Sequence, residues 1–153
     1  MNLKINNRFE INAYKIIILV CLSLASFCAF QIVEADLCVM GYYENGVVTH
    51  FYEIKGSEID DMVVFGAAGI LGFIFSPMYF FRLSRSWWIG LFTTLCLLQF
   101  FCLSLVTIPL NQIIYDSVKF CDNFWIVAFL IFQFIFIILN LLYINISKHW
   151  KSA

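Results

Sequence analysis

The chain has 153 residues, of which 63% are hydrophobic and 12% charged, and its formal net charge is −1. A soluble domain is nearer roughly 45–50% apolar and about 25% charged, so the composition excludes an ordinary soluble domain. We expect membrane lipid to be the solvent for most of the chain, and we expect no nucleic-acid partner.

The first apolar run covers 16–33 and follows a basic N-terminal stretch that carries Lys4, Arg8 and Lys15. A helix needs about 20 residues to cross a hydrocarbon core of ~30 Å, so this run predicts a first, rather short, membrane span. A cleaved signal peptide is the competing interpretation, because Val33-Glu34-Ala35 resembles a small-x-small cleavage site.

Residues 34–61 are expected to form the larger of two outer loops. Two β-rich stretches, Cys38–Tyr43 and Val47–Ile54, flank the dipeptide Asn-Gly, which is a strong hairpin signal because both residues tolerate positive φ. We therefore predict a β-hairpin in a small outer cap, and an N-terminal helix cap at Ser57–Asp61 for the next span. The hairpin residues expected to face a partner are Glu44, Asn45, Gly46, His50 and Tyr52.

The second predicted span, 62–81, contains a cluster of small residues. Such a face lets another helix backbone approach closely, so we expect it to be a helix-packing surface. Its members are Gly66, Ala68, Gly69 and Gly72. Pro77 is expected to bend the far end of this span.

A five-residue turn, 82–86, separates the second span from a third predicted span at 87–108. So short a connection predicts that the two helices are antiparallel neighbours. Arg82 and Arg85 indicate that the turn is cytoplasmic. We expect the dipeptide Trp87-Trp88 to anchor the third span at the membrane interface.

The fourth predicted span is 124–144, and the smaller outer loop before it is 109–123. Gln99 and Gln133 each lie at a depth of about 13 Å in their spans, at 1.5 Å per residue. A buried amide in hydrocarbon seeks a partner, so we predict a hydrogen bond between these two glutamines across a helix interface.

Basic residues are distributed unequally between the predicted loops, which predicts that both termini are cytoplasmic. The inner side has Lys4, Arg8, Lys15, Arg82, Arg85, Lys148 and Lys151, whereas the outer side has Lys55 and Lys119. The fold predicted for 1–153 is a single all-α membrane domain, an antiparallel bundle of four transmembrane helices with a small outer cap. The compartment expected is the bacterial inner membrane.

The cysteines Cys38 and Cys121 both fall in outer loops, where an oxidising compartment permits a disulfide. The alternative is that they are two small, unpaired apolar residues. The other four cysteines lie in predicted spans and are expected to be packing residues there: Cys21, Cys28, Cys96 and Cys102. The chain has no Cys-x-x-Cys motif, so a metal or redox site has no local support and we expect no cofactor. The four-span enzymes that reoxidise disulfide catalysts with quinone need such a motif in their first outer loop, so the chain is similar to them in layout only.

The four predicted spans contain no Asp, Glu, Lys, Arg or His, and the sequence has no nucleophile elbow, zinc-helix motif or phosphate loop. Ionisable residues inside spans usually mark proton relays and transport sites. We therefore expect a protein that is not an enzyme and not a coupled transporter.

The layout of four spans, cytoplasmic termini and a tight basic inner turn resembles the colicin A-type immunity proteins, which protect cells from pore-forming colicins. The resemblance covers the overall plan without a shared motif, so it assigns no functional residues. It implies a membrane-inserting toxin as the partner. The alternatives are a structural or accessory subunit of a larger membrane complex, and a thiol-redox membrane enzyme.

Overall fold

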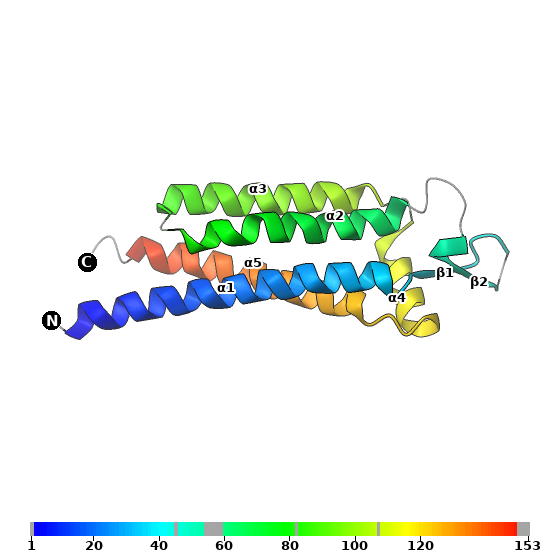
Figure 1. Ribbon diagram of the computed structural model, residues 1–153, viewed down its shortest axis with the longest axis horizontal. Coiled ribbons are helices and arrows are strands. Elements are labelled where there is room, and N and C mark those ends of the chain that lie inside the picture. Colours follow the sequence, from blue (N-terminus) through cyan, green and yellow to red (C-terminus); the bar gives the residue numbers. More distant parts are fainter. Residues whose placement is uncertain (1, 45, 54–59, 82, 107, 150–153) are drawn as a thin grey trace.

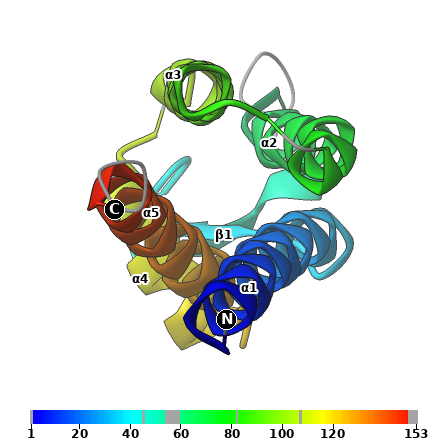
Figure 2. The ribbon, with the colours of Figure 1, turned by 90° about the vertical axis from the view of Figure 1, so that its left-hand side faces the viewer.

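Four long helices form the body of the molecule. The computed structural model describes residues 2–44, 46–53, 60–81, 83–106 and 108–149. The long helices are α1 (Asn2–Glu34), α2 (Asp60–Phe75), α3 (Arg85–Ser104) and α5 (Trp125–His149), and helices that are neighbours run antiparallel (Figure 1). Viewed end-on, they form a ring in the order α1, α2, α3, α5 (Figure 2).

Four segments of the bundle are long and apolar enough to cross a membrane, and the second of them continues past the end of α2. These segments are Asn12–Glu34, Met62–Phe80, Arg85–Ser104 and Trp125–Ile146. The sequence-based ranges agree with them to within a few residues at most ends. The helical bundle and its two-stranded cap are therefore as predicted.

The first helix is much longer than the predicted span 16–33, because it begins at Asn2. The chain contains no glycine or proline before Gly41, so nothing in the backbone interrupts a helix in this region. The apolar run locates the lipid-soluble part of this helix, but it does not mark where the helix begins.

The connection between α2 and α3 is tight. After Phe75 the chain continues as a 3₁₀ helix over Ser76–Phe80, with Pro77 in its first turn. The hydroxyl of Ser84 then caps α3 by accepting a hydrogen bond from the Trp87 backbone N–H at 3.4 Å. The turn predicted at 82–86 therefore ends earlier than expected, because α3 already begins at Arg85. Arg82 lies outside the described residues.

The small residues of α2 pack against α1 inside the same chain. A Cβ atom added at Gly69 would lie 3.0 Å from Ala29 Cβ, and one added at Gly72 would lie 2.0 Å from Ser26 Oγ. Ala68 is fully buried, and Gly66 faces Val33. This face is therefore occupied by α1 and does not remain free for another protein.

The bundle has two hydrophobic clusters, one near each end. The cluster near the termini includes Tyr79, Trp88 and Phe136, which make edge-on ring contacts. Trp88 is 1% exposed and donates its indole N–H to Asn140 Oδ1 at 3.1 Å. The prediction that both tryptophans of the pair are interfacial anchors is thus wrong for Trp88, whereas Trp87 is exposed.

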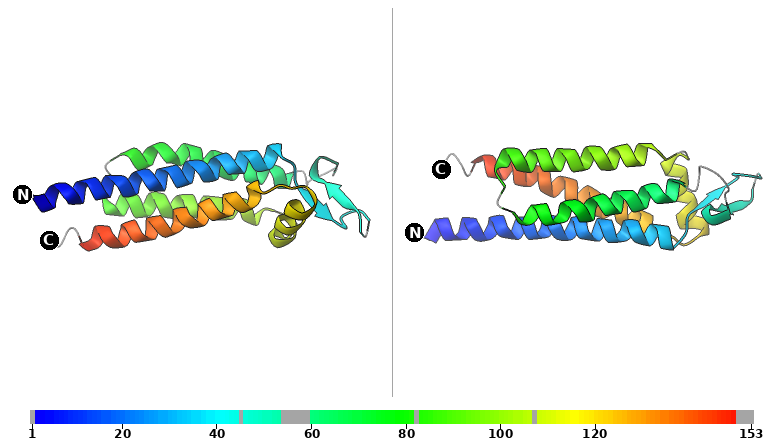
Figure 3. Two further views of the ribbon diagram at one scale, coloured as in Figure 1. Left: turned by 90° about the horizontal axis from the view of Figure 1, so that it is seen from below. Right: turned by 45° about the horizontal axis from the view of Figure 1, so that its top comes forward.

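The other end of the bundle carries the cap, which we define as 36–53 and 109–123. Strands β1 (Cys38–Met40) and β2 (Val48–His50) pair antiparallel, and a 3₁₀ turn, Phe51–Glu53, follows. The segment 109–123, expected to be a loop, instead contains an amphipathic helix, α4 (Leu110–Phe120), which lies beside the strands (Figure 3). Pro109 precedes its first turn, and its buried side includes Ile113.

Candidate functional site in the cap

Helix α4 holds the outer edge of strand β1 through its side chains. The Cys38 N–H donates to Ser117 Oγ at 3.1 Å, and the Met40 N–H donates to Asp116 Oδ2 at 2.9 Å. Gln112 Nε2 donates to the Met40 carbonyl at 3.2 Å. Asp116 and Ser117 are buried, so α4 satisfies the backbone groups that β2 leaves open on this edge.

The hairpin register places His50 directly opposite Cys38. The flanking backbone bonds, from Phe51 N to Leu37 O and from Gly41 N to Val47 O, make this a non-hydrogen-bonded pair. Side chains approach most closely in such pairs, and both point to the same face. His50 Nδ1 accordingly lies 3.5 Å from Cys38 Sγ.

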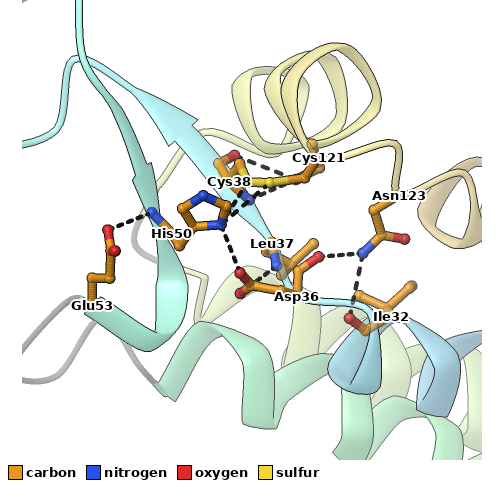
Figure 4. Close-up of polar contacts among 9 residues, drawn as sticks. Ile32, Asp36, Leu37, Cys38, His50, Glu53, Cys121 and Asn123 are labelled. Atoms are coloured by element: carbon orange, nitrogen blue, oxygen red, sulfur yellow. Dashed lines mark hydrogen bonds and ion pairs between the residues drawn. A yellow bond between two sulfur atoms is a disulfide. The ribbon is translucent and has the colours of Figure 1, made fainter.

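Cys38 and Cys121 form a disulfide across 83 residues, with their Cα atoms 6.2 Å apart. Cys121 follows the last turn of α4, and its backbone N–H donates to the Ser117 carbonyl. Its sulfur also lies 3.5 Å from His50 Nδ1. The disulfide therefore ties α4 to the hairpin beside the imidazole ring (Figure 4).

Asp36 completes the cluster. Its Oδ2 lies 2.9 Å from His50 Nδ1, and in the tautomer with the proton on Nδ1 the histidine donates to this carboxylate. The Leu37 N–H donates to Oδ1 at 2.8 Å, and Asn123 Nδ2 donates to the Asp36 backbone carbonyl. Asp36 has a φ of 65°, a left-handed conformation that these bonds hold in place.

Among the described residues, these four side chains form one group that could hold a metal ion. One donor atom from each of Asp36, Cys38, His50 and Cys121 lies within 4.8 Å of the others. Cys38 is buried, while the side chains of His50 and Asp36 are 37% and 21% exposed. Two sulfurs, an imidazole and a carboxylate in a half-buried position can support either thiol–disulfide exchange or metal binding.

The hairpin residues expected to face a partner take different positions. Glu44 and Tyr52 are exposed, as is Gly46, which has a φ of 84° in the turn closed by Val47 N and Glu44 O. His50 lies beside the cysteines with its side chain 37% exposed, and the prediction that it faces a partner stays a prediction. Asn45 lies outside the described residues, as do 54–59, which include most of the predicted helix cap.

Amide side chains link three helices near the middle of the bundle. Gln133 Nε2 donates to Gln99 Oε1 at 2.6 Å, so the two glutamines meet as their equal depths suggested. Gln99 Nε2 also donates to the Ala68 carbonyl at 3.4 Å. Asn140 was not predicted to be a polar partner; it is fully buried and also donates to the Phe136 carbonyl.

Both cysteines and His50 were candidate residues in the sequence, but their meeting and the part played by Asp36 were not predicted. The sequence carried no signal for this meeting, because a two-residue turn at Asn45-Gly46 would place Cys38 opposite Glu53, whereas the observed register places it opposite His50. Asp36 had no signal either, because its position depends on the left-handed turn after α1.

Comparisons with protein families, with curated proteins and with solved structures found no significant match.

Proposed function

We propose that the chain is an integral membrane protein with four spans, with both termini and the α2–α3 connection in the cytoplasm and the cap outside. Large apolar side chains on the outer surface of the ring support this proposal. Phe100 and Phe101 on α3 are 72% and 61% exposed, and Phe134 on α5 is 65% exposed. An apolar surface of this kind suits lipid and would be a liability in water.

The charge distribution supports the same orientation. The termini and the α2–α3 connection lie at one end of the bundle, and the cap lies at the other (Figure 1). Seven of the nine basic residues belong to the first end in sequence, and only Lys55 and Lys119 belong to the cap end. Basic residues are retained on the cytoplasmic side of a bilayer.

We infer further that the protein acts by binding and is an immunity protein against a pore-forming toxin. The observation that carries this inference is that the predicted spans contain no Asp, Glu, Lys, Arg or His, while the cap brings an acid, a histidine and two cysteines together. Such a bundle offers lipid-exposed helices to the inserting helices of a toxin, and the cap would meet the toxin on the side from which it arrives.

Protection of sensitive cells tests this function. Bacteria that produce the chain, and bacteria with the empty vector, are challenged with individual pore-forming toxins delivered past the outer membrane by osmotic shock. We expect the membrane potential to survive in producing cells for one toxin and to collapse for the others. Loss of potential in producing cells for every toxin tested would contradict the proposal.

The structure bears differently on the two alternative functions, an accessory membrane subunit and a thiol-redox enzyme. The accessory-subunit alternative loses the small-residue face of α2 as its docking surface, because α1 covers it. The thiol-redox alternative gains the position of His50 beside the Cys38–Cys121 disulfide. It predicts that Cys38→Ser abolishes function, whereas an immunity protein keeps protecting cells as long as this variant folds.

A further inference from the structure

The donor atoms of the cap cluster are arranged around one point. His50 Nδ1 is 3.5 Å from Cys38 Sγ, 3.5 Å from Cys121 Sγ and 2.9 Å from Asp36 Oδ2 (Figure 4). All four donor atoms lie within 4.8 Å of one another. Because the two sulfurs are bonded to each other, the nitrogen lies near both of them, and the carboxylate of Asp36 approaches the same nitrogen.

These distances are close to the edges of a tetrahedral zinc site. With Zn–S near ~2.3 Å and Zn–N near ~2.0–2.1 Å, the nitrogen-to-sulfur edge is about 3.5 Å and the nitrogen-to-oxygen edge about 3.3 Å. Both nitrogen-to-sulfur distances match the first value, and the distance to the carboxylate is a few tenths of an ångström shorter than the second. In a zinc site the two sulfurs lie about 3.8 Å apart, so the disulfide must open and both cysteine side chains must turn, with His50 following them, before the site can form.

The residues around the cluster hold its ligands as those of a metal site do. The Leu37 N–H occupies Asp36 Oδ1 and leaves Oδ2 directed at the cluster. Asn123 fixes the Asp36 backbone, and the Tyr52 ring stacks on His50 with centroids 5.2 Å apart. Hydrogen bonds that orient ligand side chains in this way raise metal affinity.

We propose that the cap cluster is a redox-controlled site for one divalent thiophilic cation, with Zn²⁺ as the expected ion. In the oxidised chain Cys38 and Cys121 share the disulfide, and their sulfurs cannot serve as thiolate ligands. A dithiol reductant supplies two electrons and two protons, becomes a disulfide itself, and leaves two thiols. Zn²⁺ then binds Cys38 and Cys121 as thiolates, with release of their two protons. His50 binds through Nδ1 with its own proton on Nε2, and Asp36 completes the site.

Both states join the same elements of the cap. The disulfide connects β1 with the end of α4 covalently, and the metal would connect the same two residues and add Asp36 and His50. The reduced, metal-free chain lacks either connection. The cap is thus expected to be held in the oxidised state and in the reduced, metal-bound state. This inference does not depend on the proposed immunity function.

Cobalt(II) titration of the full-length chain in detergent micelles tests the site. Protein reduced with a phosphine, then freed of it without oxygen, is titrated with Co²⁺ and back-titrated with Zn²⁺. We expect one Co²⁺ per chain, with the thiolate charge-transfer band and the visible bands of a tetrahedral ion, all removed by Zn²⁺. The oxidised protein should show none of these bands.

Matched variants separate the cluster from adventitious binding. His50→Ala and Asp36→Asn leave the disulfide possible, so its formation and the melting temperature of the oxidised protein report folding. We expect each variant to weaken Zn²⁺ binding at least tenfold, whereas Cys102→Ser, which alters a cysteine outside the cap, leaves it unchanged. The proposal is overturned if the reduced protein shows no tetrahedral bands, if folded His50→Ala binds as tightly as the parent, or if the disulfide resists reduction in the folded chain.

Discussion

At the scale of single residues, Gly72 marks the closest approach of α1 and α2. The nearest atom to a Cβ at this position is Ser26 Oγ, at 2.0 Å, and Ser26 Cβ is 3.3 Å away. Gly90 on α3 has no atom within 4 Å of such a Cβ. The two glycines therefore form a natural pair for comparison, since both lie in helices and only one is tightly packed.

We expect Gly72→Ala to lower the free energy of unfolding by about 1–3 kcal/mol, because the new methyl group overlaps the Ser26 hydroxyl. Gly90→Ala should leave stability unchanged or raise it by up to about 1 kcal/mol through helix propensity. Ser26→Ala should restore part of the loss in the Gly72→Ala background, because it removes the overlapping oxygen. Thermal unfolding in detergent measures all three, and equal melting temperatures for the two glycine variants would contradict this packing.

The buried amides show how far single residues could be predicted. Gln99 and Gln133 were predictable partners because each is an isolated polar residue at the same depth in an apolar run. Asn140 was not recognised, because its partner Trp88 looks like an interfacial residue in the sequence. A tryptophan at the predicted end of a span fits both the interface and the core, and only the neighbouring helices decide between them.

At the scale of elements, α4 is the part of the fold that the sequence did not reveal. It has 11 residues, and polar side chains such as Asn111 and Lys119 alternate with its apolar ones. So short a helix has little stability of its own, and tertiary contacts supply it here. Its hydrogen bonds to β1 come from Gln112, Asp116 and Ser117, and they could not be predicted without knowing that β1 lies beside it.

We expect Asp116→Ala to loosen the edge of β1, because the Met40 N–H loses its described acceptor. This hydrogen bond is part-buried, and a hydrogen bond to a charged group contributes about 1.5–3 kcal/mol, so amide exchange in the peptide around Met40 should accelerate about tenfold or more. Asn111→Ala, an exposed position on the same helix, should leave exchange unchanged. Hydrogen–deuterium exchange with mass spectrometry measures both, and identical rates would show that Asp116 does not hold the strand.

At the scale of the whole molecule, the bundle was predictable because lipid-soluble helices must be long and continuously apolar. Four such runs separated by short connections leave few arrangements other than an antiparallel bundle. The order around the ring was not predictable, because it depends on which faces fit together. The contact between α1 and α2 through Gly69 and Gly72 settles one side of that order.

We expect a topology reporter inserted at Ser84, or fused at either terminus, to be active only in the cytoplasm, and one inserted at Glu44 to be active only outside. The reason is the retention of basic residues on the cytoplasmic side, combined with the position of the cap at the opposite end of the bundle. Paired enzymatic reporters that work on opposite sides of the membrane measure this. A Ser84 fusion that is active outside would invert the proposed orientation.

The Asn123 side chain connects the cap to two helices of the bundle through hydrogen bonds. One amide nitrogen donates to the carbonyl of Ile32 in the last turn of α1 and to that of Asp36, and its oxygen accepts the Trp125 N–H at the start of α5. The end of one long helix and the beginning of another thus share a single side chain with the turn that leads into the cluster. A shift of that turn would be transmitted to both helices at once, whatever causes it.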